Sequence, residues 1–269
     1  MRSILLHIDE DDCLEPRLQV ALDLARAFDG HVSCLQAVPY VFGVPGDIYG
    51  TMAVELLPEV RETADALQTR LEQQLSGEDV AWDYSQEDGF APERLLRRCG
   101  LSDIVVVGSC DPLRPKGPSI LAGDMVLKAR TPVMIVPPGT KSLDCGGAAI
   151  AAWDGSPEAA HALRSAVPLL KKAAAVTLVT VSGEKDAKTV ELPPIEGAEY
   201  LSRHGIECDM VELPCDGSVA QTLVAAASAR DAAYLVMGAY GRSRLLETVW
   251  GGVSRELFTK PPLPVLACH

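Results

Sequence analysis

The chain has 269 residues, a length that suits one large domain or two small ones, and 48% of them are hydrophobic against 23% charged, as in packed globular proteins. Its 24 basic and 37 acidic side chains leave a formal charge of −13, which repels nucleic-acid backbones and anionic membrane surfaces. We therefore expect no nucleic-acid partner and no membrane binding.

The first half of the chain alternates apolar strands with amphipathic helices. Strands are predicted at residues 4–8 and 31–38, on either side of a helix at residues 16–28. Residues 103–108 (DIVVVG) form an uninterrupted apolar strand, which is typical of a parallel sheet covered by helices on both faces. The segment 39–58 contains several Gly and Pro residues, and we interpret it as a structural loop or as a lid or partner surface.

The same order of elements returns in the second half. Strands are predicted at 148–152, 176–181 and 234–238, and helices at 157–172 and 219–229. Three pairs of residues align at offsets of 130 to 145 positions: Asp9 with Asp154, Gly108 with Gly238, and Pro132 with Pro264. Such a small drift in offset over half a chain indicates an internal duplication.

Prolines and glycines between residues 137 and 147 separate the two halves, which predicts a domain boundary near residue 142. The domains are then residues 1–140 and 146–269. The βαβ order and the right-handed crossover rule predict an α/β fold with two tandem Rossmann-like domains. Each would contain a small, parallel, doubly wound sheet of about five strands flanked by helices.

The eight cysteines form no CxxC pair and lie largely in apolar segments, so we expect reduced, buried thiols rather than disulfides or metal ligands. No apolar run approaches the roughly 18 residues of a membrane span. The acidic residues 9–12 come before the core of a signal peptide could develop. These observations favour a cytoplasmic protein.

The second half carries a glycine pattern at the end of a strand, where ligands of open α/β sheets bind. Gly238 and Gly241 are followed by nine residues and then by the sequence GGVS at 251–254. Glycines allow backbone N–H groups to approach a phosphate, and the start of the following helix also attracts an anion. Arg242 and Arg244 could neutralise phosphate charge. Motifs of P-loop proteins, dinucleotide-binding domains and α/β-hydrolases are absent from the sequence.

These residues resemble the universal stress protein family. The resemblance rests on DGSPEAAHAL at 154–163, on GAYGRSRLLETVWGGVSREL at 238–257 and on the closing PLPVLAC. It covers the chain as two tandem copies and is most specific in the second. The family has a Rossmann-like domain, and one subgroup binds ATP through Gly, two residues, Gly, nine residues, Gly and then Ser or Thr. The resemblance therefore implies ATP, with Mg²⁺ as its counter-ion, in the second half.

The resemblance also assigns roles to single residues. Gly238, Gly241 and Gly251 match the phosphate-loop glycines, Asp154 matches an acid that contacts the ribose or base, and Val181 matches a residue beside adenine. The full candidate site is Asp154, Val181, Gly238, Gly241, Arg242, Arg244, Gly251, Gly252, Val253 and Ser254. Gly252 stands where the family has Ser or Thr, a loss of about 1 kcal/mol for an ordinary hydrogen bond. Asp154 also precedes Ser-Pro, which is typical of a capped helix start, so a purely structural role stays open.

The first half departs from the pattern. Asp111 replaces the second glycine, Pro112, Pro115 and Pro118 follow, and more acids stand next to Asp9, so we expect this half to bind no nucleotide. We find no catalytic apparatus. The resulting hypothesis is a stress-response protein that binds ATP as a regulatory module. The family commonly dimerises, which implies pairing of the two halves within one chain, a possible homodimer and an unidentified protein partner. The alternatives are a nucleotide-independent interaction module, with 39–58 as its contact surface, and a slow ATPase.

Overall fold

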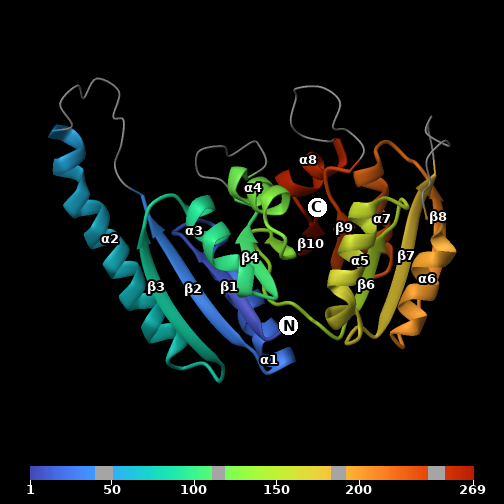
Figure 1. The fold of residues 1–269 in the computed structure, drawn as a ribbon, viewed down its shortest axis with the longest axis horizontal. Coiled ribbons are helices and arrows are strands. Elements are labelled where there is room, and N and C mark those ends of the chain that lie inside the picture. The colour runs from blue at the N-terminus through green and yellow to red at the C-terminus, as the bar shows by residue number, and fades with distance from the viewer. Residues whose placement is uncertain (40–50, 111–118, 183–191, 242–251) are drawn as a thin grey trace.

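The computed structural model describes residues 1–39, 51–110, 119–182, 192–241 and 252–269 (Figure 1). The elements of the first half are β1 (Ser3–Ile8), α1 (Leu14–Phe28), β2 (His31–Val38), α2 (Thr51–Leu75), β3 (Ala81–Asp88), α3 (Ala91–Arg98), a 3-10 turn (Cys99–Leu101), β4 (Ile104–Gly108), α4 (Ile120–Lys128) and β5 (Val133–Val136). Those of the second half are β6 (Ala148–Ala152), α5 (Pro157–Leu170), β7 (Ala175–Ser182), α6 (Pro194–Arg203), β8 (Asp209–Pro214), α7 (Val219–Ala229), β9 (Ala232–Gly238), α8 (Gly252–Thr259) and β10 (Val265–Cys268).

The fold is α/β, and the strands form one ten-stranded sheet in the order β3-β2-β1-β4-β5-β10-β9-β6-β7-β8. Within each half the five strands are parallel, as the sequence predicts. Each set is a Rossmann-like unit whose crossovers are helical, and helices flank the sheet (Figure 1). In both units the first strand lies between its successor and the fourth strand, so the strand order reverses beside β1 and beside β6.

The two units meet at the centre of the sheet, where β5 and β10 pair antiparallel. Val133, Met134 and Ile135 lie opposite Ala267, Leu266 and Val265, and all six side chains are fully buried. Each of the two clusters of buried apolar side chains also contains residues from both halves. Separating the halves would therefore expose apolar surface that is now removed from water.

The segment 39–58 is only in part what the sequence suggested. Residues 40–50 lie outside the described part of the chain, but Thr51–Leu75 form the helix α2, so the interpretation of 51–58 as loop is wrong. Downstream of Pro58, Ala64, Leu67, Leu71 and Leu75 are buried at helical spacing, and α2 covers the outer strand β3 (Figure 1). Proline usually interrupts a helix, which is why Pro58 suggested a loop. The buried apolar side chains nevertheless hold α2 against the sheet. In the described residues, no helix is both long and apolar enough to cross a bilayer.

Candidate functional site

The candidate site lies where β6 and β9 run side by side and the strand order reverses. Gly238 is the last residue of β9 and sits directly against the start of α5. A Cβ atom at Gly238 would lie 2.4 Å from the backbone nitrogen of Ala159 and 2.6 Å from the carbonyl carbon of Glu158. The close approach of strand and helix thus requires glycine here, a packing reason that is independent of any ligand.

Asp154 organises the turn between β6 and α5. Its Oδ1 accepts hydrogen bonds from the backbone N–H of Ser156 at 3.0 Å and from the Ser156 hydroxyl at 2.6 Å. Ser156 is the N-cap of α5, and its Oγ accepts a bond from the Ala159 N–H at 3.1 Å. The structure thus confirms the structural role that the sequence left open for Asp154. Asp154 itself is exposed to solvent.

A carboxylate that the sequence analysis missed lies beside the second glycine. Oε2 of Glu158 is 2.8 Å from the place a Cβ at Gly241 would take, and the Ser156 Oγ is 3.7 Å from it. Glu158 is half-buried in the first turn of α5, where it is favourably placed relative to the helix dipole. An anion bound at Gly241 would meet this negative charge unless the Glu158 side chain turns away.

Ser254 has a structural contact. Its Oγ accepts a long hydrogen bond of 3.4 Å from the backbone N–H of Tyr240, a residue with a φ of 63°. The Tyr240 ring meets Phe258 edge-on at 6.0 Å and His269 at 6.3 Å, and burial raises the pKa of its hydroxyl. These contacts tie the start of α8 to the chain just beyond β9, and Ser254 is buried.

The remaining candidates are less closely assembled. Val181, in β7, and Val253, in α8, are half-buried and pack against one of the apolar clusters. Gly252 is exposed, and a Cβ there would contact nothing within 4 Å, so the structure leaves room for the Ser or Thr that the family has. Arg242, Arg244 and Gly251 lie outside the described residues. The structure therefore brings together Asp154, Gly238 and Gly241, and adds Ser156 and Glu158.

The corresponding strand ends of the first half hold a cysteine and a buried arginine. A Cβ at Gly108 would lie 2.6 Å from the Cβ of Cys13 and 3.0 Å from Nη1 of Arg17. The Arg17 side chain is fully buried and donates to the carbonyl oxygens of His7, at 2.7 Å, and Asp9, and to Oδ1 of Asp11 at 2.5 Å. A guanidinium and its partners thus occupy the carboxyl ends of β1 and β4. A nucleotide-free first half stays a prediction.

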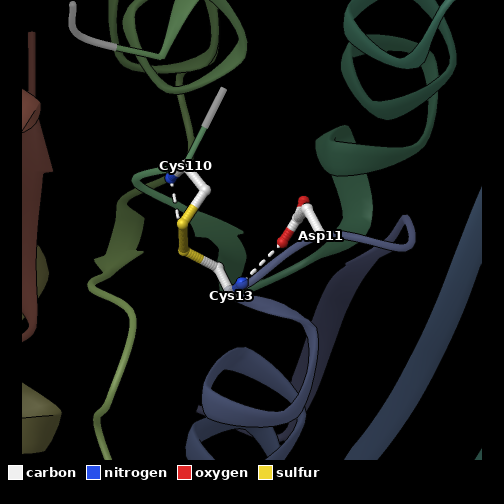
Figure 2. Close-up of side chains that lie close together, drawn as sticks. All are labelled: Asp11, Cys13 and Cys110. Carbon is white, nitrogen blue, oxygen red and sulfur yellow. Dashed lines mark hydrogen bonds between the residues drawn. A yellow bond between two sulfur atoms is a disulfide. The ribbon is translucent and has the colours of Figure 1, made fainter. Parts of the chain in front are cut away.

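A disulfide joins Cys13, before α1, to Cys110, after β4 (Figure 2). The prediction that all eight cysteines are reduced thiols is wrong for this pair. The six free cysteines agree better with the prediction of buried thiols. Four of them are buried and two are half-buried, namely Cys34, Cys99, Cys145 and Cys268, and Cys208 and Cys215. The structure places two distant segments of the chain together, with Cα atoms 6.0 Å apart, which sequence spacing alone does not reveal.

One group of three side chains in the described residues has the spacing of metal ligands, namely Asp11, Cys13 and Cys110, whose ligand atoms lie within 4.8 Å of one another. Both sulfur atoms are used in the disulfide (Figure 2). Asp11 is paired with Arg17. In this oxidised form the group offers no thiolate to a metal.

Comparison with known proteins supports the fold and the family. Residues 149–269 match the model of the universal stress protein family. A universal stress protein from Archaeoglobus fulgidus is 18% identical with a TM-score of 0.76, and the similarity covers 98% of this chain and 97% of that one. A protein of unknown function from Pseudomonas aeruginosa is 17% identical with a TM-score of 0.60, over 100% of this chain and 92% of that one. A putative universal stress protein from Pseudomonas aeruginosa is 17% identical with a TM-score of 0.58, over 100% and 93%.

No curated protein sequence matches the chain significantly. At these identities the solved structures establish the fold alone, and the similarity to the universal stress protein family rests on the sequence match over residues 149–269. The chain is therefore UspA-like, in that its residues 149–269 are similar to the universal stress protein family.

Proposed function

We propose that this chain is a cytoplasmic, nucleotide-responsive regulatory protein that binds one ATP, with Mg²⁺ as counter-ion, in its second half. The observation that carries the proposal is the difference between the halves at the reversal of strand order. In the second half Gly241 and the exposed turn at Asp154 lie together, whereas in the first half a buried arginine, Arg17, and a disulfide lie at the corresponding strand ends.

The two repeats in this proposal are residues 1–140 and 146–269. The first acts as a structural counterpart, and its strand β5 completes the sheet of the second. A homodimer and a protein partner remain predictions. The loop that would close over the phosphates, with Arg242 and Arg244, falls outside the described residues. Binding would favour one of two forms of the protein, and the partner would respond to that change.

Glu158 is the residue that opposes the proposal. Its carboxylate lies against Gly241 and repels a triphosphate, which favours the alternative of a nucleotide-independent interaction module. The side chain is only half-buried, and its end can rotate away from Gly241 without moving the backbone. The two functions therefore differ in what removal of this charge does.

We expect Glu158→Gln to bind MgATP about tenfold more tightly than the wild type, which corresponds to about 1.4 kcal/mol. The neutral side chain keeps the size of Glu158 and removes the repulsion at Gly241. Isothermal titration calorimetry of the ligand-free full chain measures the dissociation constant. Glu207→Gln removes an exposed charge beyond α6 and should leave the affinity unchanged. If neither the wild type nor Glu158→Gln binds at millimolar MgATP, the chain is not an ATP-binding protein.

A further inference from the structure

The disulfide lies in the first half at the position that corresponds to the glycine loop of the second. At the offsets that align Asp9 with Asp154 and Gly108 with Gly238, Cys13 corresponds to Glu158 and Cys110 to Tyr240. The two cysteines are 97 residues apart in sequence and link the start of α1 to the end of β4 (Figure 2). The bond therefore joins the two segments that correspond to the start of α5 and the glycine loop in the second half.

The two sulfur atoms differ in their access to solvent. Cys13 is fully buried beneath Gly108, whereas Cys110 is half-buried and is the last described residue before 111–118. A thiol in solution would therefore attack the sulfur of Cys110, and the sulfur of Cys13 would leave. The direction of attack matters because a thiol of low pKa leaves more readily.

The surroundings of Cys13 favour its thiolate. Cys13 is the N-cap of α1, at the positive end of the helix dipole, and its Sγ accepts a bond of 3.2 Å from the Cys110 backbone N–H. The guanidinium of Arg17 lies near this sulfur, because both atoms approach the place that a Cβ at Gly108 would take. Nη1 of Arg17 is 3.0 Å from that place and Sγ of Cys13 is 3.3 Å from it. Arg17 forms an ion pair at 2.5 Å with Asp11, whose carboxylate lies within 4.8 Å of both sulfur atoms. The two charges largely cancel, so the helix end and the N–H bond are what favour the thiolate.

Other thiols of the chain lie in surroundings that suppress the thiolate. Burial raises the pKa of Cys34 to about 12 and that of Cys145 and Cys268 to about 11, and it also raises the pKa of Cys99 and Cys208. Such thiols react slowly with disulfides at neutral pH. Reversible oxidation is therefore expected at Cys13 and Cys110 rather than at these five thiols.

We propose that Cys13 and Cys110 form a reversible thiol–disulfide site that exchanges with low-molecular-weight thiols. In reduction, a thiolate attacks the sulfur of Cys110, the bond between the cysteines breaks, and Cys13 leaves as a thiolate. A second thiolate then attacks the outer sulfur of the mixed disulfide, which releases the low-molecular-weight disulfide and the Cys110 thiolate. Two thiols are oxidised and one protein disulfide is reduced.

Oxidation runs the same steps in reverse. The Cys110 thiolate attacks a low-molecular-weight disulfide and expels one thiolate, and Cys13 then attacks the sulfur of Cys110 and expels the second. This inference rests on the proposed cytoplasmic location, because disulfides in that compartment are usually transient, redox-sensing or catalytic. It does not depend on ATP binding, so the two proposals can fail separately.

The test is thiol alkylation of the full chain after incubation with reduced or oxidised glutathione, followed by mass spectrometry of the peptides. With oxidised glutathione, we expect a peptide linked through Cys13 and Cys110. With millimolar reduced glutathione, we expect both residues to be alkylated while circular dichroism shows a folded protein. Absence of the linked peptide in the first buffer, or its persistence in the second, would overturn the proposal.

Single variants test the order of attack. In Cys13→Ser, oxidised glutathione should form a stable mixed disulfide with Cys110, whereas in Cys110→Ser the buried Cys13 should react at least tenfold more slowly. Equal rates at the two residues would contradict the assigned order. Cys215→Ser is the matched control, because it removes a half-buried thiol beyond the end of β8 and should leave formation of the linked peptide unchanged.

Discussion

Replacing Arg17 with Met is expected to lower the free energy of unfolding by about 3–5 kcal/mol, the range found when one partner of a buried ion pair is removed. The guanidinium is fully buried, and the side chain of its partner Asp11 is only 6% exposed. The substitution would leave that carboxylate without its cation and would remove the donors from the carbonyl oxygens of His7 and Asp9. Chemical denaturation followed by circular dichroism measures the change.

Two further variants separate the charge effect from general damage. Arg26→Met removes a guanidinium that is 35% exposed, although it contacts Glu78 and Asp79, and should cost less than about 1 kcal/mol. Adding Asp11→Asn to Arg17→Met removes the uncompensated charge and should restore part of the stability. A loss below about 1 kcal/mol for Arg17→Met alone would show that the buried pair does not hold the first half together.

Replacing Gly238 with Ala is expected to cost about 3 kcal/mol, at the upper end for overpacking of a well-filled interior. The added methyl would lie 2.4 Å and 2.6 Å from backbone atoms of α5, so the strand and the helix would have to move apart. The same movement would displace the turn at Asp154, and we expect MgATP to bind at least tenfold more weakly. Denaturation and calorimetry measure the two effects.

Gly100→Ala is the control for this substitution. A Cβ at Gly100 would contact nothing within 4 Å, so the change in stability should stay within about 0.5 kcal/mol. If Gly238→Ala is as stable as Gly100→Ala, the close contact between β9 and α5 is not a constraint on the sequence at this position.

The repeated α/β order could be predicted from the sequence because continuous apolar runs, such as residues 103–108, mark buried parallel strands. The antiparallel pairing of β5 and β10 could not, since both strands are short and wholly apolar and carry no signal for their neighbour. Helix α2 was missed because Pro58 stands inside it, and the buried stripe among its described residues lies downstream of that proline. Local patterns therefore predict elements better than they predict how the elements meet.

In the candidate site, too, local features could be predicted from the sequence and contacts between elements could not. The turn at Asp154 is a local feature, and its hydrogen bonds to Ser156 follow from the sequence Asp-Gly-Ser-Pro. Glu158 and Gly241 lie in different parts of the chain, and no sequence spacing predicts that they come close together. The burial of Arg17 and its neighbourhood with the Cys13–Cys110 bond likewise depend on packing between α1 and the end of β4. A sequence signal that could have identified the disulfide is not present.

The central claim is that the second half, and not the first, holds the nucleotide. Its most direct test is calorimetry of MgATP with the wild type and with Gly241→Asp, which places in the second half the acid that Asp111 supplies at the corresponding position of the first. We predict one ATP per wild-type chain and an affinity at least tenfold lower in the variant, because the new carboxylate would repel the phosphates. Unchanged affinity in Gly241→Asp, or two ATP molecules per wild-type chain, would contradict the claim.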